Sequence, residues 1–238
     1  MQALQYRALE RIRTPRPVDR VKTLSGWALG KRILDLGALD ETALEQKQGN
    51  GRWLHAELCG SAREVLGIDN SEKLPADGLV TAPNGRIIKG DIFDLGGVLE
   101  EFGTLDALVA GELIEHLPDT LGWLLSLRGN RRLSGAELLF STPNACSWYN
   151  AIVGVAGCES THQDHLQVYS YKTLRTLFDR SGLDLLELTP YHARFDEMRE
   201  SSGAVGRVAV TLFQGGVNVL ESVFPMLSGG WLGRARIP

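Results

Sequence analysis

Apolar positions along this chain follow two different spacings. Short runs that are apolar almost throughout end in Asp, Asn or Gly, and between them lie longer segments of helical length. A strand that is apolar throughout is buried on both faces, which is typical of a parallel sheet with helical crossovers. We therefore expect an α/β fold: a doubly wound, mostly parallel sheet with helices on both faces. The strands predicted in this way are residues 31–37, 63–70, 85–94, 105–112 and 136–144.

The last third of the chain has a different pattern. Residues 169–182 carry Leu174, Leu177 and Phe178 at helical spacing and end in Gly182, which predicts a helix. Further along, a stretch with many β-branched residues has helical length, and we favour a helix there. The elements expected after the first helix are a strand at 183–191, a polar loop or short helix at 192–204, a helix at 206–227 and an edge strand at 230–238.

The chain contains neither an internal repeat nor a low-complexity linker, so we expect a single domain over residues 1–238. Helices are predicted between the first strands, among them residues 51–62 and 120–133. Three accessory segments flank this core. They are an N-terminal helical extension (1–30), a loop that covers the substrate (144–168), and a C-terminal helix with an edge strand (192–238).

Composition adds few constraints. Hydrophobic residues make up 43% and charged residues 23% of the 238 residues, which is typical of a globular domain. The net charge of −4 gives no overall positive field that would attract nucleic acid. The three cysteines form no CxxC pair, which argues against a disulfide framework or a zinc motif. Because no segment resembles a signal peptide or a bilayer span, we expect a cytoplasmic protein without a membrane partner.

Candidate binding residues lie at the ends of the predicted strands, where an open α/β sheet binds its ligands. Asp69 ends the second strand, and its carboxylate is suited to accept from both hydroxyls of a ribose. Gly37 follows the first strand and would let the backbone approach a ligand closely. Asp91, after the third strand, could accept from an exocyclic amine. Each of these residues taken alone could equally be a turn or a cap.

The segment GELIEHL carries Glu112, Glu115 and His116 directly after the fourth predicted strand. In a helical turn this spacing would place all three side chains on one face. Three interpretations stay open: His116 as a general base or orienting group, purely structural roles, or a divalent cation bound by the set. Oxygen ligands with imidazole suit magnesium or manganese, and also zinc or iron.

The ordered set of strand-end motifs resembles the class I S-adenosylmethionine-dependent methyltransferases over roughly residues 30–190. The resemblance implies a Rossmann-like, seven-stranded sheet whose last strand is antiparallel, with S-adenosylmethionine as cofactor. The motifs that carry it are ILDLG, VLGIDNS, GDIFD, LDALVAGELIEHL and LLFSTPN. The residues that it assigns to cofactor binding are Asp35, Gly37, Asp69, Asn70, Asp91, Ile92 and Gly111.

The first motif departs from the family pattern. The family usually has three glycines after the aspartate, whereas this chain reads DLGALDETALEQKQGNG and keeps only Gly37 in its expected place. A nest of backbone N–H groups normally holds the methionine carboxylate at this point. We expect a longer loop with Gly49 and Gly51 to rebuild that contact, so that cofactor binding is retained.

A second resemblance concerns a metal site. The segment HQDHLQ contains His162 and His165 and should fold back over the same sheet edge. An E-x-x-E-H stretch followed by D-H resembles the ligand sets of small-RNA terminal-ribose 2′-O-methyltransferases and of metal-dependent O-methyltransferases of ubiquinone biosynthesis. Carried over, the ligands of a Mg, Mn, Zn or Fe ion would be Glu112, Glu115, His116 and His165.

These features together predict O-methylation of a small-molecule hydroxyl, with His116 and Glu115 as catalytic residues and a divalent metal as an open addition. Trp148 and Tyr149 are expected as walls of the acceptor site. We expect no nucleic-acid partner. If the chain forms an oligomer, we expect a homodimer. The alternatives are an RNA terminal-ribose 2′-O-methyltransferase and a non-catalytic module that has lost its cofactor.

Overall fold

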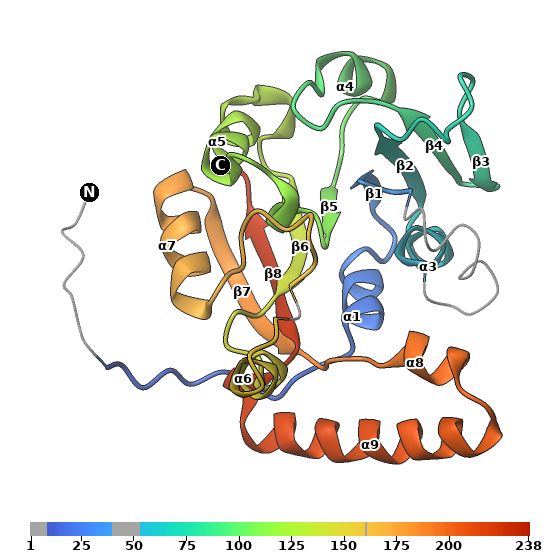
Figure 1. Cartoon of the computed structure of the whole chain (residues 1–238). Coiled ribbons are helices and arrows are strands. Elements are labelled where there is room, and N and C mark those ends of the chain that lie inside the picture. The colour runs from blue at the N-terminus through green and yellow to red at the C-terminus, as the bar shows by residue number, and fades with distance from the viewer. Residues whose placement is uncertain (1–8, 40–52, 160) are drawn as a thin grey trace.

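The computed structural model describes residues 9–39, 53–159 and 161–238, and Figure 1 shows their arrangement. The expectation that Gly49 and Gly51 rebuild the first motif lies outside these residues. A single mixed sheet runs through the molecule, with helices on both of its faces (Figure 1). The predicted α/β fold class is therefore confirmed.

The sheet has eight strands in the order β3-β4-β2-β1-β5-β6-β8-β7. Strands β4, β2, β1, β5 and β6 are parallel neighbours, β3 is antiparallel to β4, and β8 is antiparallel to both β6 and β7. The antiparallel last strand is as expected. The strands are β1 (Arg32–Leu36), β2 (Glu64–Asp69), β3 (Leu79–Ala82), β4 (Gly85–Lys89), β5 (Ala107–Gly111), β6 (Glu137–Pro143), β7 (Asp184–Tyr191) and β8 (Gly230–Arg236).

Two expectations about the sheet were wrong: that it has seven strands, and that the last strand lies at its edge. The additional strand is β3, a short strand that is only half-buried and pairs with β4 in a hairpin, so it lacks the apolar run by which the other strands were recognised. The last strand, β8, is not at the edge: it lies between β6 and β7, and Trp231 and Leu232 on it are fully buried. Its neighbour β7 is the edge strand, and the first half of β7 is only partly buried.

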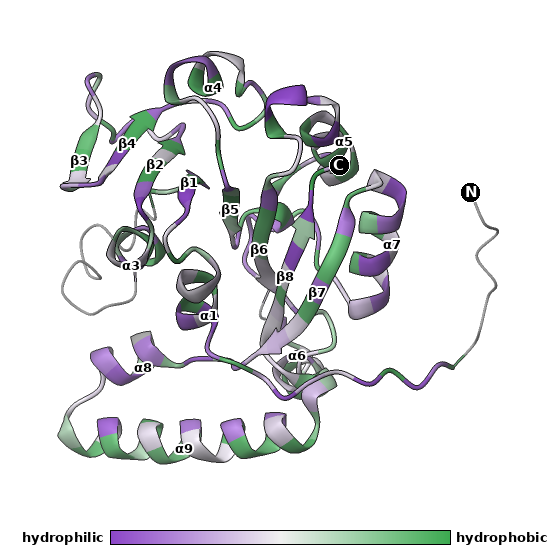
Figure 2. Ribbon diagram, turned by 180° about the vertical axis from the view of Figure 1, so that it is seen from behind, coloured by the Kyte–Doolittle hydropathy of each residue, from purple (hydrophilic) through white to green (hydrophobic). Residues whose placement is uncertain are grey.

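Different helices cover the two faces of the sheet. Alternate residues of β1 point to opposite faces: Leu34 and Leu36 belong to the core cluster shared with α4, α5 and α7, whereas Ile33 belongs to the cluster shared with α1 and α3. Helices α8 and α9 lie beyond the end of the sheet (Figures 1 and 2). The helices are α1 (Arg20–Trp27), α3 (Leu54–Ser61), α4 (Gly96–Phe102), α5 (Thr120–Gly129), α6 (Trp148–Val155), α7 (Tyr171–Ser181), α8 (Asp196–Ser201) and α9 (Ala204–Val223). The described residues also form three short 3-10 turns, η1 (Ile114–His116), η2 (Arg131–Leu133) and η3 (Pro225–Leu227).

Local sequence explains the helix that was predicted best, α7. Ser170 and Thr173 form a reciprocal capping box at its start. Gly182 ends the helix in the left-handed conformation, with φ of 71°, which glycine adopts without strain. Leu174 and Phe178 are fully buried against the sheet. The predicted helix, its stop at Gly182 and its apolar inner face are confirmed, although the helix begins two residues later than predicted.

Two accessory segments differ from expectation. In the described part of the N-terminal extension, residues 9–30, the only helix is α1, and residues 9–19 before it are extended. Pro15 and Pro17 in this stretch each lack a backbone donor and favour extended backbone before them. The segment 144–168, expected as a loop, contains α6, which is capped by the hydroxyl of Ser147. The long apolar segment near the C-terminus is a helix, α9, as expected.

Candidate active site

A cavity of about 660 Å³ opens at the carboxyl ends of β1, β2 and β4. The predicted residues that line it come from strand ends that are far apart in the sequence. Because carboxyl ends of parallel strands meet at one edge, the sheet brings these side chains together. Those that line it are Gly37, Asp69, Asn70, Asp91, Ile92 and His116.

Asp69 is held firmly at the cavity wall. Its Oδ1 accepts from the backbone N–H of Ser71 and its Oδ2 from that of Leu39, both at 2.9 Å. The carboxylate is 9% exposed, and this fixed orientation presents it to the cavity. Since a carboxylate oxygen can accept more than one hydrogen bond, these contacts are compatible with further donors from a ligand.

Gly37 and Asp91 have the local geometry that the sequence suggested. Gly37 has φ of 69°, and a Cβ there would come within 3.2 Å of Leu113. Because glycine has no side chain, the backbone itself forms this part of the cavity wall. Asp91 is exposed, and its Oδ1 accepts from the backbone N–H of Phe93 at 2.8 Å, which orients the carboxyl group at the cavity rim.

Two predicted cofactor residues do not line the cavity. Asp35 is buried on the other face of β1, where its Oδ2 lies 2.9 Å from Nδ1 of His55. Burial alone would lower the pKa of His55, but the hydrogen bonds and charges of Asp35 and then Cys59 together outweigh it and raise the pKa to about 9. Gly111 packs closely against Leu54, whose side chain a Cβ would overlap. Both residues therefore support the scaffold of the site.

The GELIEHL segment is a tight turn, and the expectation of one helical face is wrong. Strand β5 ends at Gly111, and Glu112 then adopts a left-handed conformation with φ of 56°. This turn separates Glu112 from the 3-10 turn η1 that carries Glu115 and His116. The carboxylate of Glu112 instead accepts from the hydroxyl of Tyr191 at 2.9 Å.

Glu115 is the most unusual ionisable group of the site. Its side chain is 0% exposed, and neither carboxylate oxygen has a hydrogen-bond partner among the residues that the structure describes. Burial, followed by the negative charge of Glu112, raises the pKa of Glu115 to about 9. The positive charge of Arg20 acts in the opposite direction but does not offset these two effects, so a carboxylate here would be stabilised by a proton or by a further cation beside it.

His116 and His165 lie next to Glu115. Nδ1 of His116 donates to the backbone carbonyl of Asp164 at 3.1 Å, which leaves the lone pair on Nε2. The rings of His116 and His165 meet edge to face, with centroids 4.7 Å apart. Ligand atoms of Glu115, His116 and His165 all lie within 4.8 Å of one another. Of the four predicted metal ligands, three thus come together, and Glu112 is not one of them.

Backbone contacts hold His165 in this place. The N–H groups of Leu166 and Gln167 both donate to the carbonyl of Glu115, at 2.9 and 3.1 Å. The segment after α6 therefore folds back over the sheet edge, as the sequence suggested. Burial and then the neighbouring His116 lower the pKa of His165, which favours the neutral imidazole that can accept a proton or bind a metal.

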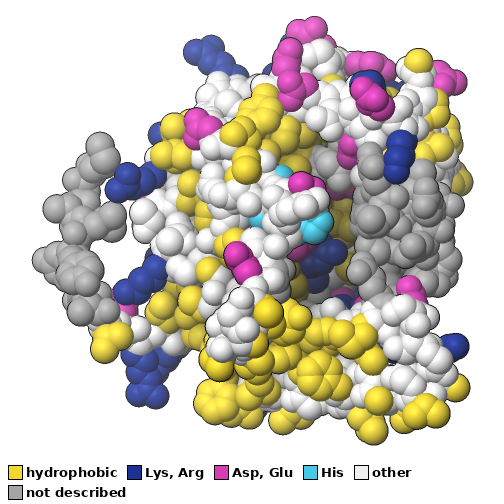
Figure 3. All heavy atoms as spheres, viewed as in Figure 1, with side chains coloured by type: hydrophobic (Ala, Val, Ile, Leu, Met, Phe, Trp, Pro, Cys, Tyr) yellow, Lys and Arg dark blue, Asp and Glu magenta, His cyan; other side chains and the backbone are white. Residues whose placement is uncertain are grey.

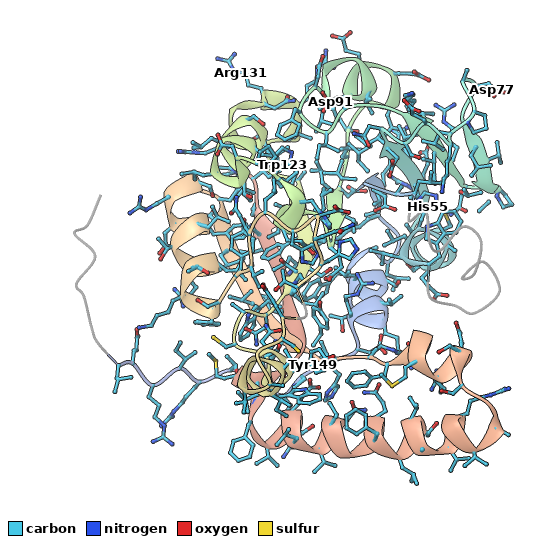
Figure 4. All side chains as sticks on the ribbon, viewed as in Figure 1. His55, Asp77, Asp91, Trp123, Arg131 and Tyr149 are labelled. Carbon is cyan, nitrogen blue, oxygen red and sulfur yellow. The ribbon has the colours of Figure 1, made fainter. Side chains whose placement is uncertain are left out.

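A second, smaller pocket of about 230 Å³ adjoins this cluster. His165 lies in its wall, together with the aromatic side chains of Trp148, Tyr149 and Phe195 and the polar Asn144. Figure 3 shows the histidines at the centre of this face beside acidic side chains, and Figure 4 shows Asp91 and Tyr149 on opposite sides of it. The histidine pair thus connects the two hollows.

Comparison with known proteins decides the family. The model of the methyltransferase domain family matches residues 8–188. This chain belongs to that family. No curated protein matches it.

Solved structures share the fold of this methyltransferase at low sequence identity. An S-adenosylmethionine-dependent methyltransferase from Archaeoglobus fulgidus has a TM-score of 0.51 and 19% identity, covering 91% of each chain. The magnesium protoporphyrin IX methyltransferase of Synechocystis, with bound S-adenosylhomocysteine, has a TM-score of 0.54 and 12% identity over 92% of this chain and 82% of its own. A protein from Bacillus halodurans described as a methyltransferase has a TM-score of 0.53 and 14% identity, covering 92% and 98%.

The cavity fits the methyl donor of this methyltransferase, S-adenosylmethionine. A carboxylate after β2 and another after β4 provide acceptors along one wall, and Gly37 leaves the backbone accessible between them. Sequence reasoning missed Phe195 and Leu113, which line the hollows, and Tyr191, which orients Glu112. Phe195 and Tyr191 come from the end of the chain, so no local motif signals them.

Proposed function

We propose that this methyltransferase transfers the methyl group to a hydroxyl of a small molecule, at the junction between the two hollows. One observation carries the proposal: His116 lines the larger cavity, His165 lines the smaller, and their rings are 4.7 Å apart. A donor in the first and an acceptor in the second would therefore meet at a pair of imidazoles. Such a pair can bind or receive the proton that a hydroxyl must lose.

The larger cavity would hold the donor through its strand-end residues. Asp69 would accept from the ribose hydroxyls and Asp91 from the adenine amine, with the methionine part beside Gly37. S-adenosylmethionine, when bound, supplies an already activated methyl group. The task left to the chain is to orient the acceptor oxygen behind that methyl and to exclude water.

The smaller pocket would hold the acceptor. Its volume of about 230 Å³ suits a molecule of a few rings at most, and Trp148, Tyr149 and Phe195 offer flat apolar surfaces. Asn144 is buried and already occupied, since its Oδ1 accepts from Trp231 and its amide donates to the carbonyl of Ser228. Shape and stacking would therefore contribute to selection together with the other polar residues of the wall, Ser147, Asn150 and Thr161, and the polar end of the acceptor would face His165.

The cluster of Glu115, His116 and His165 fits a divalent cation. One carboxylate and two imidazoles suit zinc, manganese or iron, and three protein ligands leave positions open for a substrate oxygen. The carboxylate of Glu115 has no hydrogen-bond partner among the described residues, and a coordinated cation would compensate its buried charge. Such an ion would favour the alkoxide form of the acceptor. Without an ion, Nε2 of His116 is the group that would receive the hydroxyl proton.

The test combines binding and turnover. Wild type, Glu115→Gln, His116→Asn and His165→Asn are dialysed against a chelator, titrated with S-adenosylhomocysteine, and then assayed with methyl-labelled donor. The assays compare added Mg, Mn and Zn, with catechol, phenol and a methyl glucoside as acceptors and aniline as the matched amine. We expect cofactor affinity within about threefold in Glu115→Gln and His165→Asn, and turnover at least about 100-fold lower.

Glu100→Gln is the matched control for Glu115→Gln, because Glu100 is exposed on α4 and lines neither cavity. It should keep full turnover. Metal-dependent turnover supports the cation, and turnover that survives chelation but fails in His116→Asn supports the base. Methylation of aniline but of none of the hydroxyl compounds would overturn the proposal, and so would methylation of a short RNA added to the same assay in place of every small acceptor.

A further inference from the structure

Helix α9 is oriented in the opposite way to an ordinary surface helix, because its apolar side faces away from the protein. Two of its polar side chains face the protein: Gln214 bonds to the backbone of Ala193 and Phe195, and Glu221 bonds to His192. Among its described residues only Val217 and Glu221 are buried. Most of its large apolar side chains, other than the buried Val217, instead face outward, which is the reverse of the usual amphipathic arrangement.

The outward face of α9 is a continuous apolar stripe. Its large side chains recur at helical spacing, and Figure 3 shows them gathered along the lower edge of the molecule. Figure 2 shows the same helix predominantly hydrophobic or neutral. The side chains of this stripe and their exposed fractions are Val205 86%, Val208 61%, Leu212 73%, Val219 65% and Val223 63%.

Helix α6 extends this face. Ile152 and Val155 on α6 are 59% and 92% exposed, and the helix carries no charged residue. Trp148 of α6 contacts Phe213 of α9 edge to face, with ring centroids 6.1 Å apart. We call the outward faces of α6 and α9 together the apolar platform. A monomer rarely exposes a contiguous apolar surface of this extent unless something binds it.

Charge indicates what would cover the apolar platform. The protein has a net charge of −4, yet the only exposed charge on α9 is Arg207. Arg11, Arg13 and Arg16 are exposed on the extended segment that runs from the start of α7, where Glu10 pairs with Lys172, to the end of β7. This segment lies at the same end of the molecule as α6 and α9 (Figure 1).

These positive groups discriminate between two occupants. A two-fold contact with a second copy pairs a surface with itself, so arginines at both ends of the platform would meet like charges. A bilayer with anionic head groups would meet the same arginines with opposite charge, and its acyl region would receive the apolar side chains. No helix among the described residues has the length and hydropathy to cross a membrane. A helix lying in the interface needs neither.

We propose that the apolar platform of α6 and α9 binds the surface of an anionic lipid bilayer, with α9 lying in the interface plane. Tyr149, which lines the smaller pocket, is also 43% exposed on α6, so the pocket lies beside the bound surface. The proposal does not depend on the acceptor chemistry. It replaces the expectation of no membrane partner, which rested on the lack of a spanning segment.

The experiment is flotation of the full-length protein with vesicles of phosphatidylcholine alone and of phosphatidylcholine with phosphatidylglycerol. Wild type should float with the anionic vesicles and much less with the neutral ones. Leu212→Glu and Val208→Glu place a carboxylate on the platform and should lower the bound fraction at least about tenfold. Val80→Glu is the control, because Val80 is 79% exposed on β3 at the far edge of the sheet and should leave binding unchanged.

Two results would overturn the proposal: wild type that stays in solution with anionic vesicles, or flotation that Leu212→Glu leaves intact. Light scattering tests the other occupant: a wild-type dimer that Leu212→Glu converts to monomer, without vesicle binding, assigns the platform to a second copy. Titration of the same samples with S-adenosylhomocysteine separates this question from the proposed function. A protein that floats but binds no cofactor refutes the methyltransferase chemistry alone.

Discussion

At the scale of single residues, Asp35 shows how a motif residue can have a structural role. In a strand, alternate side chains point to opposite faces, so Asp35 shares the face of Ile33, which packs against α1 and α3. There it meets His55, whose Nε2 is in turn 2.9 Å from the hydroxyl of Thr81. The alternation was visible in the sequence, but the partner, twenty residues away on α3, was not.

This buried pair predicts a pH dependence of stability. The pKa of His55 is raised from 6.5 to about 9 in the folded protein. Its stabilising contribution is therefore fully present below pH 6.5 and is lost as pH rises through about 9. We expect the free energy of unfolding, measured by urea titration, to fall by up to about 3 kcal/mol over this interval on account of His55.

The matched variant for this prediction is His55→Gln, which keeps a donor for Asp35 but does not titrate. Glu115, whose pKa is also raised to about 9, adds a slope of the same sign, so the measurement is the difference between variant and wild type. His55→Gln should show a shallower fall between pH 6.5 and 9. Equal slopes in the two proteins would contradict the assignment.

At the scale of elements, the position of β8 in the sheet is the main feature that the sequence did not indicate. Local patterning predicts that a strand exists but not which strands lie beside it. The glycines of β8 held a signal, since a glycine within a strand often marks a close approach. A Cβ on Gly230 would overlap Tyr191 of β7, and one on Gly233 would overlap the ring of Phe140 on β6. The two glycines thus mark the close contacts of β8 with both of its neighbouring strands.

The close approach at Gly233 gives a prediction for the sheet. Phe140 is fully buried and stacks on Phe178 with ring centroids 4.7 Å apart, so it has no free space to move into. Gly233→Ala should therefore lower the free energy of unfolding by about 3 kcal/mol, at the upper end for overpacked cores. Gly60→Ala on α3 is the control: nothing lies within 4 Å of its Cβ, and it should be neutral or stabilising by up to about 1 kcal/mol in the same denaturant titration.

Features that depend on local sequence could be predicted, whereas features that depend on contacts between distant segments could not. Strand ends and helix caps are local, so Gly37, Asp69, Asp91 and the helix at 169–182 were predicted correctly as to place. The turn at Glu112 and the contact of Tyr191 with it depend on chain segments that meet only in the fold. The outward apolar face of α9 could not be foreseen either, since the pattern alone does not say which side of an amphipathic helix is covered.

At the scale of the whole molecule, several segments that are distant in the sequence together form the larger cavity. Its wall combines the ends of β1, β2 and β4 with η1, and these segments are joined only through the sheet. A ligand that binds all of them stabilises the folded chain as a unit and has no comparable site in the unfolded chain. A module that had lost its cofactor would lack this coupling, which makes thermal unfolding a direct test of the two interpretations.

We expect S-adenosylhomocysteine at 100 times its dissociation constant to stabilise the protein by about 2.7 kcal/mol. For a chain of this size that corresponds to a rise in melting temperature of about 5–10 °C, measured by calorimetry. Asp91→Asn replaces one of the two acceptor oxygens on the cavity wall with an amide donor and should weaken binding about tenfold, halving the stabilisation at the same ligand concentration. Asp94→Asn changes an exposed carboxylate that does not line the cavity and should behave as wild type. A wild-type protein whose melting temperature does not move at millimolar ligand would mean that this member of the methyltransferase family does not bind the donor, because mass action allows no tight ligand of the folded state to leave stability unchanged.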